Sequence, residues 1–287
     1  MILLAINIPT YERLESFSSI MGELEMNLKP LAQTLKDMIE INVFENNSSV
    51  ANQKQKLCKE ISSRSSIQIF FSINQKNIGG DRNILRCCSG NSNARFTWVL
   101  GDDDHIVSDS ILKILFLLFK HKDNLGLLIL SDNSYNFNPI LKNKLITSYE
   151  QFARSAINIQ PHLLIAHTLI SCNIFRTDIF DYSEASYVIE SLTPRSGLIA
   201  NFAHMRGMIK GLLSSNNQYN VLIPSFTTLD TTKRLPPADN FTESINKIYY
   251  FYFLWLLVEL GVNIENVPRH QEMWWLFGSA KLPSASL

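Results

Sequence analysis

The chain has 287 residues, of which 46% are hydrophobic, and it carries as many Lys and Arg residues (26) as Asp and Glu residues (26). This length and composition predict a globular protein with one large α/β domain or two small ones. The balanced charge argues against nucleic acid as a partner, and four cysteines without metal-ligand spacing or disulfide density predict reduced thiols in the cytoplasm.

The first 130 residues alternate between predicted strands and helices. We interpret the apolar run 2–8 as a first strand ended by Pro9, and not as a signal peptide, because it lacks a basic segment and a cleavage site. Ser108 is the expected cap of the last helix in this region. Strands are predicted at 2–8, 38–46, 67–73, 96–100 and 125–130, and helices from Leu14 and over 50–64, 80–90 and 108–120. This alternation, with fully apolar strands, is typical of a parallel sheet covered by helices on both faces.

The pattern is less regular after about residue 145. Residues 148–157 and 161–175 have helical or mixed character, 196–213 contains a helix, and 219–224 predicts a strand. The Pro-containing segment 232–240 is the expected linker. Beyond it, 244–262 predicts a strongly apolar helix that is too short to span a bilayer. We expect this helix to pack on the protein or to form a homodimer; the alternative is peripheral contact with the inner face of the membrane.

The most informative stretch is "RFTWVLGDDDHIVSDSILKIL", residues 95–115, where a buried strand leads into Asp102, Asp103 and Asp104. Three adjacent carboxylates repel one another, so they are either a solvated turn or a cation site. Polar clusters also follow the other three strands, as "IPTYER", "FENNSS" and "NQKNIGGDR". Ligands of open α/β sheets bind at the carboxyl ends of the strands, and Mg²⁺ and Mn²⁺ prefer carboxylate and phosphate oxygens. The convergence therefore favours a Mg²⁺ or Mn²⁺ site that bridges to a diphosphate.

Two common nucleotide-binding motifs are missing from the sequence. It contains no GxxxxGK[ST] and no GxGxxG after the first strand. The phosphates must then be held by the metal and by a cation, for which Arg82 is the nearest candidate.

Four segments, in order, resemble the motifs of family 2 glycosyltransferases with the GT-A fold. "INIPTYER" resembles the opening strand with its "IPTYNR"-type signature, and "INVFENNSS" resembles the second-strand "VVDNGS" type. "NIGGDRN" resembles the "N-x-G-x-x-x-ARN" type, and "WVLGDDDHIVSDSIL" resembles the fourth-strand "DxD" with its following helix. Order and spacing agree across residues 3–115. Each motif alone is weak, but four in sequence form a strong resemblance.

The resemblance implies an α/β fold of GT-A type, with a mostly parallel, Rossmann-like central sheet and helices on both faces. Residues 1–131 would form the nucleotide-sugar-binding half of a domain 1–231, and 132–231 the acceptor half. Residues 232–287 would form a C-terminal helical extension.

The resemblance also implies roles for individual residues. Tyr11 would stack on the nucleotide base beside Thr10, and Arg82 would face the base and phosphates. Glu45, where the family usually has Asp, would accept a hydrogen bond from the base imide. The donor-binding residues are expected to be Pro9, Thr10, Tyr11, Arg13, Glu45, Asn77, Arg82, Asp102 and Asp103.

The aspartate cluster can be aligned with the family in two ways. If Gly101 replaces the first family Asp, then Asp103 is the principal metal ligand, with Asp102 near the ribose and Asp104 in support. If Asp102 and Asp104 form the "DxD", both contribute to the metal site.

The catalytic base is less clearly marked. Inverting members of the family often place it in an "ED" pair, and this chain has none. The remaining candidates, within "FDYSEASYVIESLTP", are Glu190, Glu184 and Asp181, since a base needs one carboxylate close to the acceptor hydroxyl. His167 and His204 lie in apolar contexts typical of core histidines, although His204 is an alternative lining residue of the acceptor cleft.

Taken with the resemblance, these features predict a metal-dependent inverting glycosyltransferase that uses a nucleotide-diphospho-sugar, with UDP-sugars favoured. The acceptor would be a glycan or lipid-linked intermediate of surface-polysaccharide or glycoconjugate biosynthesis. Two alternatives stay open: a non-catalytic nucleotide-sugar-binding or scaffold protein of the same fold, and a nucleotidyltransferase. The last would usually show a Gly-rich, basic signature after the first strand, where "IPTYERLES" stands.

Overall fold

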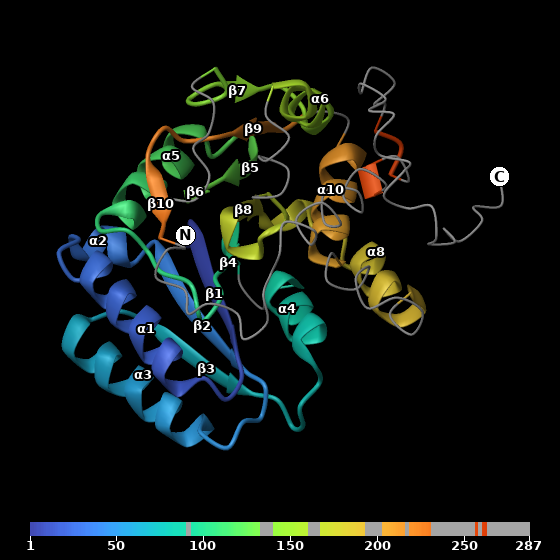
Figure 1. The fold of residues 1–287 in the computed structure, drawn as a ribbon. Coiled ribbons are helices and arrows are strands. Elements are labelled where there is room, and N and C mark those ends of the chain that lie inside the picture. The colour runs from blue at the N-terminus through green and yellow to red at the C-terminus, as the bar shows by residue number, and fades with distance from the viewer. Residues whose placement is uncertain are drawn as a thin grey trace.

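A mixed eight-stranded sheet organises the part of the chain that the structure describes (Figure 1). The computed structural model describes residues 1–89, 93–132, 140–159, 167–192, 203–215, 218–230, 256–257 and 260–262. The predicted linker 232–240 and most of the predicted helix 244–262 lie outside these residues. The strand order is β3-β2-β1-β4-β8-β5-β9-β7, and β6 pairs with β10 in a separate two-stranded sheet. The strands are β1 (Leu4–Thr10), β2 (Ile39–Glu45), β3 (Ile69–Ile73), β4 (Phe96–Val99), β5 (Leu125–Ile129), β6 (Ser131–Asp132), β7 (Leu145–Ile146), β8 (Asn173–Arg176), β9 (Asn220–Leu222) and β10 (Thr227–Leu229).

The half of the sheet built from the N-terminal strands is parallel, as the sequence predicts. β1 pairs in parallel with β2 and β4, and β2 with β3. The other half is mixed, because β8 runs antiparallel to both β4 and β5, and β7 antiparallel to β9. The most polar strand ends therefore share one edge of the sheet, at the carboxyl ends of β1, β2 and β4.

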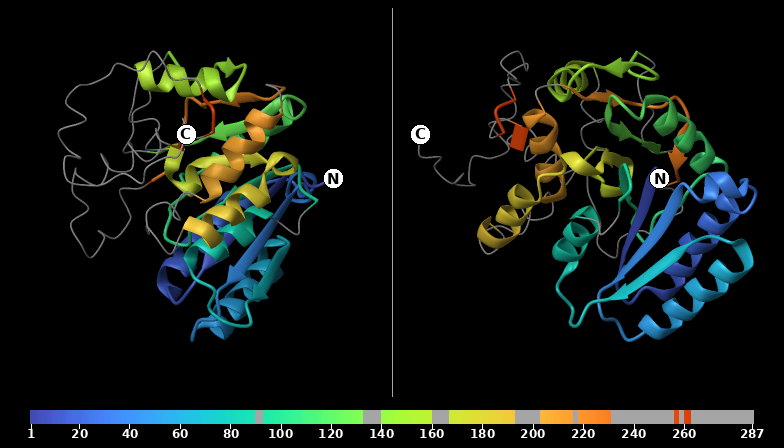
Figure 2. Two further views of the ribbon diagram at one scale, coloured as in Figure 1. Left: turned by 90° about the vertical axis from the view of Figure 1, so that its right-hand side faces the viewer. Right: turned by 180° about the vertical axis from the view of Figure 1, so that it is seen from behind.

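Helices cover both faces of this sheet (Figure 2). The α-helices are α1 (Leu14–Leu28), α2 (Gln33–Lys36), α3 (Ala51–Ser65), α4 (Gly80–Ser89), α5 (Ser110–His121), α6 (Tyr149–Ile159), α8 (Tyr182–Tyr187) and α10 (Ala203–Ser214), with short 3₁₀ turns η1 (Ile170–Cys172) and η2 (Thr177–Ile179) and a π-helical turn η3 (Val188–Leu192). One buried cluster joins α1, α3 and α5 to the sheet, and a second joins α4, α6 and α10 to its opposite face. Alternating side chains divide between the clusters: Leu128 belongs to the first, and Leu127 and Ile129 to the second.

Two local expectations are wrong. Pro9 does not end β1, which continues to Thr10; its missing N–H is tolerated because the pairing with β4 stops at Asn7. Ser108 does not cap α5. Asp109, with φ +62°, occupies that position, because the amide of Val107 is drawn to the carbonyl of Thr228 and the helix starts only at Ser110.

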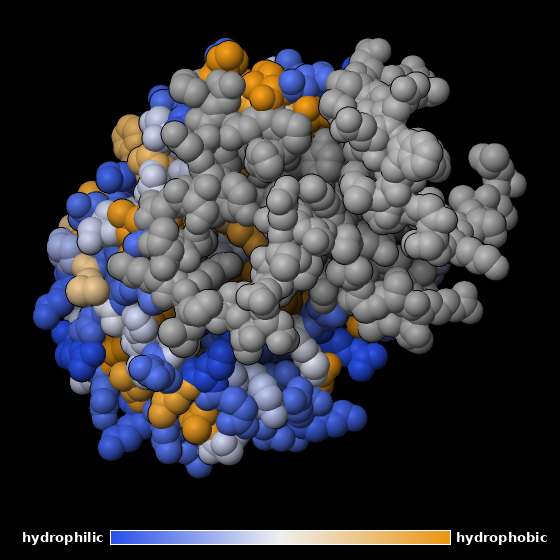
Figure 3. Space-filling model, in the orientation of Figure 1, coloured by the Kyte–Doolittle hydropathy of each residue, from blue (hydrophilic) through white to orange (hydrophobic). Residues whose placement is uncertain are grey.

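The predicted C-terminal helix is visible at a few positions. Leu256, Leu257 and Val262 are buried in the second cluster, so this part of the segment packs on the domain. Among the described helices, none combines the length and the apolarity that a membrane crossing requires. In the orientation of Figure 1, the described surface is mainly hydrophilic, with small scattered apolar groups (Figure 3).

Candidate functional site

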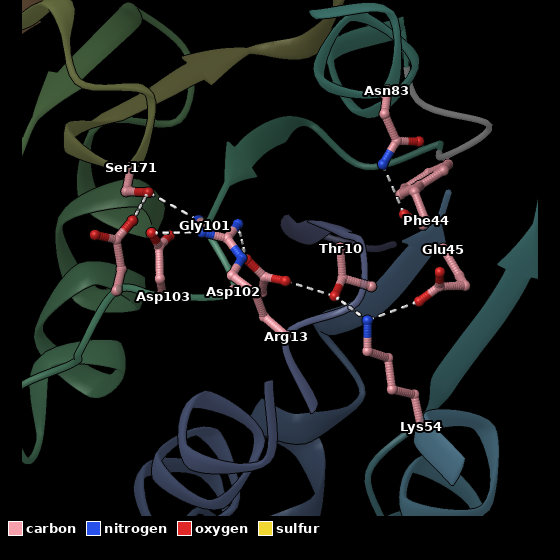
Figure 4. A network of polar contacts seen from close by, with 11 residues as sticks. Thr10, Arg13, Phe44, Glu45, Lys54, Asn83, Gly101, Asp102, Asp103 and Ser171 are labelled. Carbon is pink, nitrogen blue, oxygen red and sulfur yellow. Dashed lines mark hydrogen bonds and ion pairs between the residues drawn. The ribbon is translucent and has the colours of Figure 1, made fainter. Parts of the chain in front are cut away.

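The carboxyl ends of β1, β2 and β4 bring together residues that are far apart in the sequence (Figure 4). Thr10 lies opposite Glu45 in the parallel register of β1 and β2. The Thr10 hydroxyl donates a 2.5 Å hydrogen bond to Asp102 Oδ2, just beyond the end of β4. The Thr10 hydroxyl therefore connects the end of β1 to the aspartate cluster after β4.

The three adjacent aspartates point toward different partners. Asp102 is fully buried between Thr10 and Arg13, whereas the side chain of Asp103 is 49% exposed. Asp104 is buried and accepts a hydrogen bond from the hydroxyl of Ser171, which itself accepts one from the amide of Gly101 at 2.8 Å. Because each carboxylate has its own donor and two of the three are buried, the cluster is not a solvated turn.

Arg13 supplies the cation for two of these carboxylates. Its guanidinium pairs with Asp102 Oδ1 and, at 2.7 Å, with Asp103 Oδ2. Burial raises the pKa of the Asp102 carboxyl to about 6, against the opposing effects of the Arg13 charge and the Thr10 hydrogen bond. Arg13 lies before α1 and follows Glu12, whose positive φ of 55° turns the chain out of β1 toward the aspartates.

Glu45 has a different environment from the one expected for a base-contacting carboxylate. Its side chain is fully buried, and Oε2 accepts a 2.9 Å ion-pair hydrogen bond from Lys54, while Oε1 accepts one from the amide of Ser48 at 2.8 Å. Lys54 also donates to the Thr10 hydroxyl at 2.8 Å. Sequence reasoning missed both Lys54 and Ser171.

The other expected donor-binding residues surround this network. Asn77 accepts hydrogen bonds from the side-chain amide of Asn46 (2.8 Å) and the backbone amide of Gly79 (2.9 Å), which shapes the loop before α4. Arg82 is exposed in the first turn of α4. Tyr11 is 41% exposed, directly after β1, and Pro9 is half-buried within the strand.

The three candidate bases differ in their partners. Asp181 caps α8, accepting hydrogen bonds from the Ser183 hydroxyl and the Glu184 amide, and these hydrogen bonds lower the pKa of its carboxyl. Glu184 forms an ion pair with Arg206. Glu190 is exposed in η3, at the far end of the same segment.

The two histidines are buried core residues. His167 lies between the Tyr149 hydroxyl (3.0 Å) and the side-chain oxygen of Asn173 (2.5 Å), and burial lowers its pKa to about 3. His204 is 3.3 Å from the carbonyl of Thr168, and burial lowers its pKa to about 4. Both imidazoles are therefore neutral at pH 7.

The oxygen donors near Gly101 fit a hard divalent cation. No group of three or more His, Cys, Asp and Glu side chains is placed to hold a metal within the described ranges. A Cβ at Gly101 would, however, lie 3.1 Å from Asp103 Oδ1 and 2.7 Å from Asp104 Oδ2, so two carboxylate oxygens face the space that this glycine leaves open. Mg²⁺ is usually held by one or two carboxylates together with ligand phosphates. This donor set therefore suits a metal completed by a diphosphate.

Comparison with known proteins identifies the fold. No protein-family model and no curated protein matches the chain. Among solved structures, it resembles S. aureus TarS 1-349 in complex with UDP, with a TM-score of 0.56 and 13% identity over 92% of this chain and 76% of that one. It also resembles the mannosyltransferase PcManGT from Pyrobaculum calidifontis in complex with GDP-Man and Mn²⁺, with a TM-score of 0.55 and 9% identity over 94% and 69% of the two chains.

A longer TarS structure matches with a TM-score of 0.52 and 14% identity over 92% of this chain. The match covers 46% of that protein, so this chain spans about half its length. At these identities the likeness shows the fold, and the expected α/β fold of GT-A type is confirmed.

Proposed function

We propose that this chain of GT-A fold is a metal-dependent, inverting glycosyltransferase that transfers a sugar from a nucleotide-diphospho-sugar to a hydroxyl group. The observation that carries the proposal is the convergence of Thr10, Arg13 and the aspartate cluster at the carboxyl ends of β1 and β4. Structures of the same fold hold UDP, UDP-GlcNAc, or GDP-Man with Mn²⁺, which supports a nucleotide-sugar as the donor, with UDP-sugars favoured.

The donor roles divide between exposed and buried residues. Tyr11 and Arg82 are exposed around the site and would contact the base and the phosphates. Asp103 and Asp104 would hold Mg²⁺ or Mn²⁺, and Asp102 would lie near the ribose. When bound, the metal would neutralise charge on the departing diphosphate.

We assign the catalytic base to Glu190. Asp181 and Glu184 are engaged in a helix cap and in an ion pair with Arg206. Val188 and Ile189, which precede Glu190, belong to the same buried cluster as Leu85 of α4. Glu190 therefore comes directly after the residues that join this segment to α4. Leu85, in that cluster, lies one helical turn after Arg82. Its carboxylate would accept the proton of the acceptor hydroxyl as the new glycosidic bond forms.

The acceptor class follows from the sequence resemblance, and the location follows from the cysteines and the first apolar run. We propose a glycan or lipid-linked acceptor in surface-polysaccharide or glycoconjugate biosynthesis, and a cytoplasmic location, with peripheral contact at the inner face of the membrane as the alternative. The four cysteines are free and buried, which supports a reducing compartment.

Calorimetry with UDP, GDP and their sugars, with and without Mn²⁺, tests the donor and metal assignments together. Wild type should bind one nucleotide more tightly with Mn²⁺, and Asp103→Asn should lose most of that enhancement while transferring sugar about 10²-fold more slowly or worse. Asp123→Asn, another exposed aspartate, is the matched control. Equal enhancement by Mn²⁺ in wild type and Asp103→Asn would rule out the metal site.

A non-catalytic nucleotide-sugar-binding protein is the second candidate. The partners of Asp181 and Glu184 favour this candidate. Asp181 caps α8 and Glu184 pairs with Arg206, so two of the three candidate bases are already engaged. Single-turnover sugar transfer, or donor hydrolysis without acceptor, separates the two functions. Glu190→Gln should abolish turnover and keep donor affinity if the chain is an enzyme, whereas a wild type that binds donor without any turnover would favour the binding protein.

A further inference from the structure

Lys54 is a buried cation for which the proposed reaction has so far no role. It lies on α3 with a side chain that is 0% exposed, and its ammonium is 5.5 Å from the ring centre of Phe17. Removing an ammonium group from water is costly unless partners replace its hydration. The partners here are Glu45 Oε2 and Thr10 Oγ1, at 2.9 Å and 2.8 Å.

The Thr10 hydroxyl makes this arrangement directional. A lysine ammonium can only donate hydrogen bonds, so Thr10 Oγ1 must accept from Lys54. Its single proton is then donated to Asp102 Oδ2, 2.5 Å away. Hydrogen bonds that follow one another in this way polarise and strengthen each other.

Asp102 is consequently held from both sides. Its Oδ2 accepts from Thr10 and its Oδ1 from Arg13, which also pairs with the exposed Asp103. An unbroken series of contacts thus runs from Glu45 at the end of β2, through Lys54 and Thr10, to the aspartates after β4 (Figure 4).

We propose that Lys54 is a positioning residue of the donor site, which orients the Thr10 hydroxyl toward Asp102 and thereby fixes Arg13 and Asp103 before the donor binds. This inference rests on the proposed function. Lys54 is too deeply buried to contact the donor itself, so it acts through Thr10. Without its ammonium, the Thr10 hydroxyl would lose the donor that holds its oxygen in place and could rotate away from Asp102, so Asp102 and Arg13 would lose their fixed geometry.

A double-mutant cycle on nucleotide affinity tests this role, with UDP and GDP in the presence of Mn²⁺ as probes. Thr10→Val deletes only the connecting hydroxyl, and it should weaken binding of the preferred nucleotide about 10-fold, as should Lys54→Met. Thr10→Ser restores the hydroxyl and should recover most of the loss. The double variant should bind no more than about 3-fold more weakly than Lys54→Met alone, because both changes break the same connection. Lys56→Met, an exposed lysine on the same helix, is the control.

The outcomes separate this inference from the proposed function. Wild-type affinity in Thr10→Val, or single effects that multiply in the double variant, would overturn the role of Lys54 and leave the donor site standing. A wild type that binds neither nucleotide would overturn both. If Lys54→Met does not fold, Lys54→Arg takes its place in the cycle, since arginine keeps the charge beside Glu45 but not the position of the donor to Thr10.

Discussion

At the scale of single residues, the site is a set of charges that are each compensated locally. Arg13 offsets Asp102 and Asp103, Lys54 offsets Glu45, and a hydroxyl donates to Asp104. The ion pairs of Arg13 and Lys54 differ in their exposure to solvent. Arg13 and Asp103 are half-exposed, so under the proposed function Arg13 could exchange this carboxylate for a donor phosphate, whereas the Lys54–Glu45 pair is closed to solvent. The exposed pair is suited to ligand exchange and the buried pair to fixing the strand ends.

Replacing Glu45 should show how strongly the buried pair supports the fold. Glu45→Ala leaves the ammonium of Lys54 buried without its carboxylate, so the free energy of unfolding should fall by about 3–5 kcal/mol. Glu60→Ala removes the exposed partner of Lys56 and should change it by less than about 0.5 kcal/mol. Denaturant unfolding of both variants measures the difference. If the two losses were equal, the buried pair would have no special weight.

Glu45→Ala should also weaken binding of the nucleotide-sugar donor. Loss of the contacts that Glu45 makes should weaken nucleotide binding by about 1–3 kcal/mol, measured by calorimetry at a temperature where the variant is folded. An unchanged affinity for every nucleotide that wild type binds would remove Glu45 from the site.

At the scale of secondary-structure elements, periodicity located most helices and strands but not every important side chain on them. The buried positions of α3 are Ala51, Lys54, Cys58, Ile61 and Ser65, spaced alternately by three and four residues. This spacing places Lys54 on the buried face of α3. Lys54 was not predicted to be buried because the segment is polar overall and Lys is normally exposed. The antiparallel direction of β8 was not readable, because a short strand buried on both faces has the same pattern in either direction.

Gly211 should be indispensable to the packing of α10. A Cβ there would lie 1.6 Å from the carbonyl oxygen of Ile179, which is backbone and cannot yield. Gly211→Ala should therefore destabilise the protein by about 3 kcal/mol, the upper end of the usual cost of overpacking, because the contacted atom is backbone. Gly22→Ala on α1, where a Cβ meets nothing within 4 Å, should instead stabilise it by up to about 1 kcal/mol. Thermal unfolding of the pair tests this; similar melting temperatures would contradict the close approach.

At the scale of the whole molecule, the strand–helix alternation of residues 1–130 was sufficient to predict a sheet covered on both faces. Strand ends also predicted which residues would meet, because parallel strands bring their carboxyl ends to one edge. Ser171 could not be predicted in the same way. It lies in η1, directly before the antiparallel strand β8, and reaches Asp104 from 67 residues further along the chain. No local sequence pattern encodes such a contact.

The two buried histidines should make the whole molecule sensitive to acid. An unfolded histidine has a pKa near 6.5, whereas burial lowers the pKa of His167 to about 3 and that of His204 to about 4. At a pH between the folded and the unfolded pKa of each histidine, the unfolded chain binds a proton that the folded chain does not. The free energy of unfolding therefore falls as the pH falls below about 6.5. From pH 7 to pH 5 each histidine should cost about 2 kcal/mol.

His204→Leu isolates this contribution. Asp102 acts in the opposite sense, because its folded pKa of about 6 favours the folded state as the pH falls, but its effect is common to wild type and variant. Urea unfolding at pH 7, 6 and 5 should therefore show that the loss of stability from pH 7 to 5 is about 2 kcal/mol smaller in His204→Leu than in wild type. The same loss in both proteins would mean that His204 takes up its proton without unfolding, and that this face of the domain opens to water at low pH.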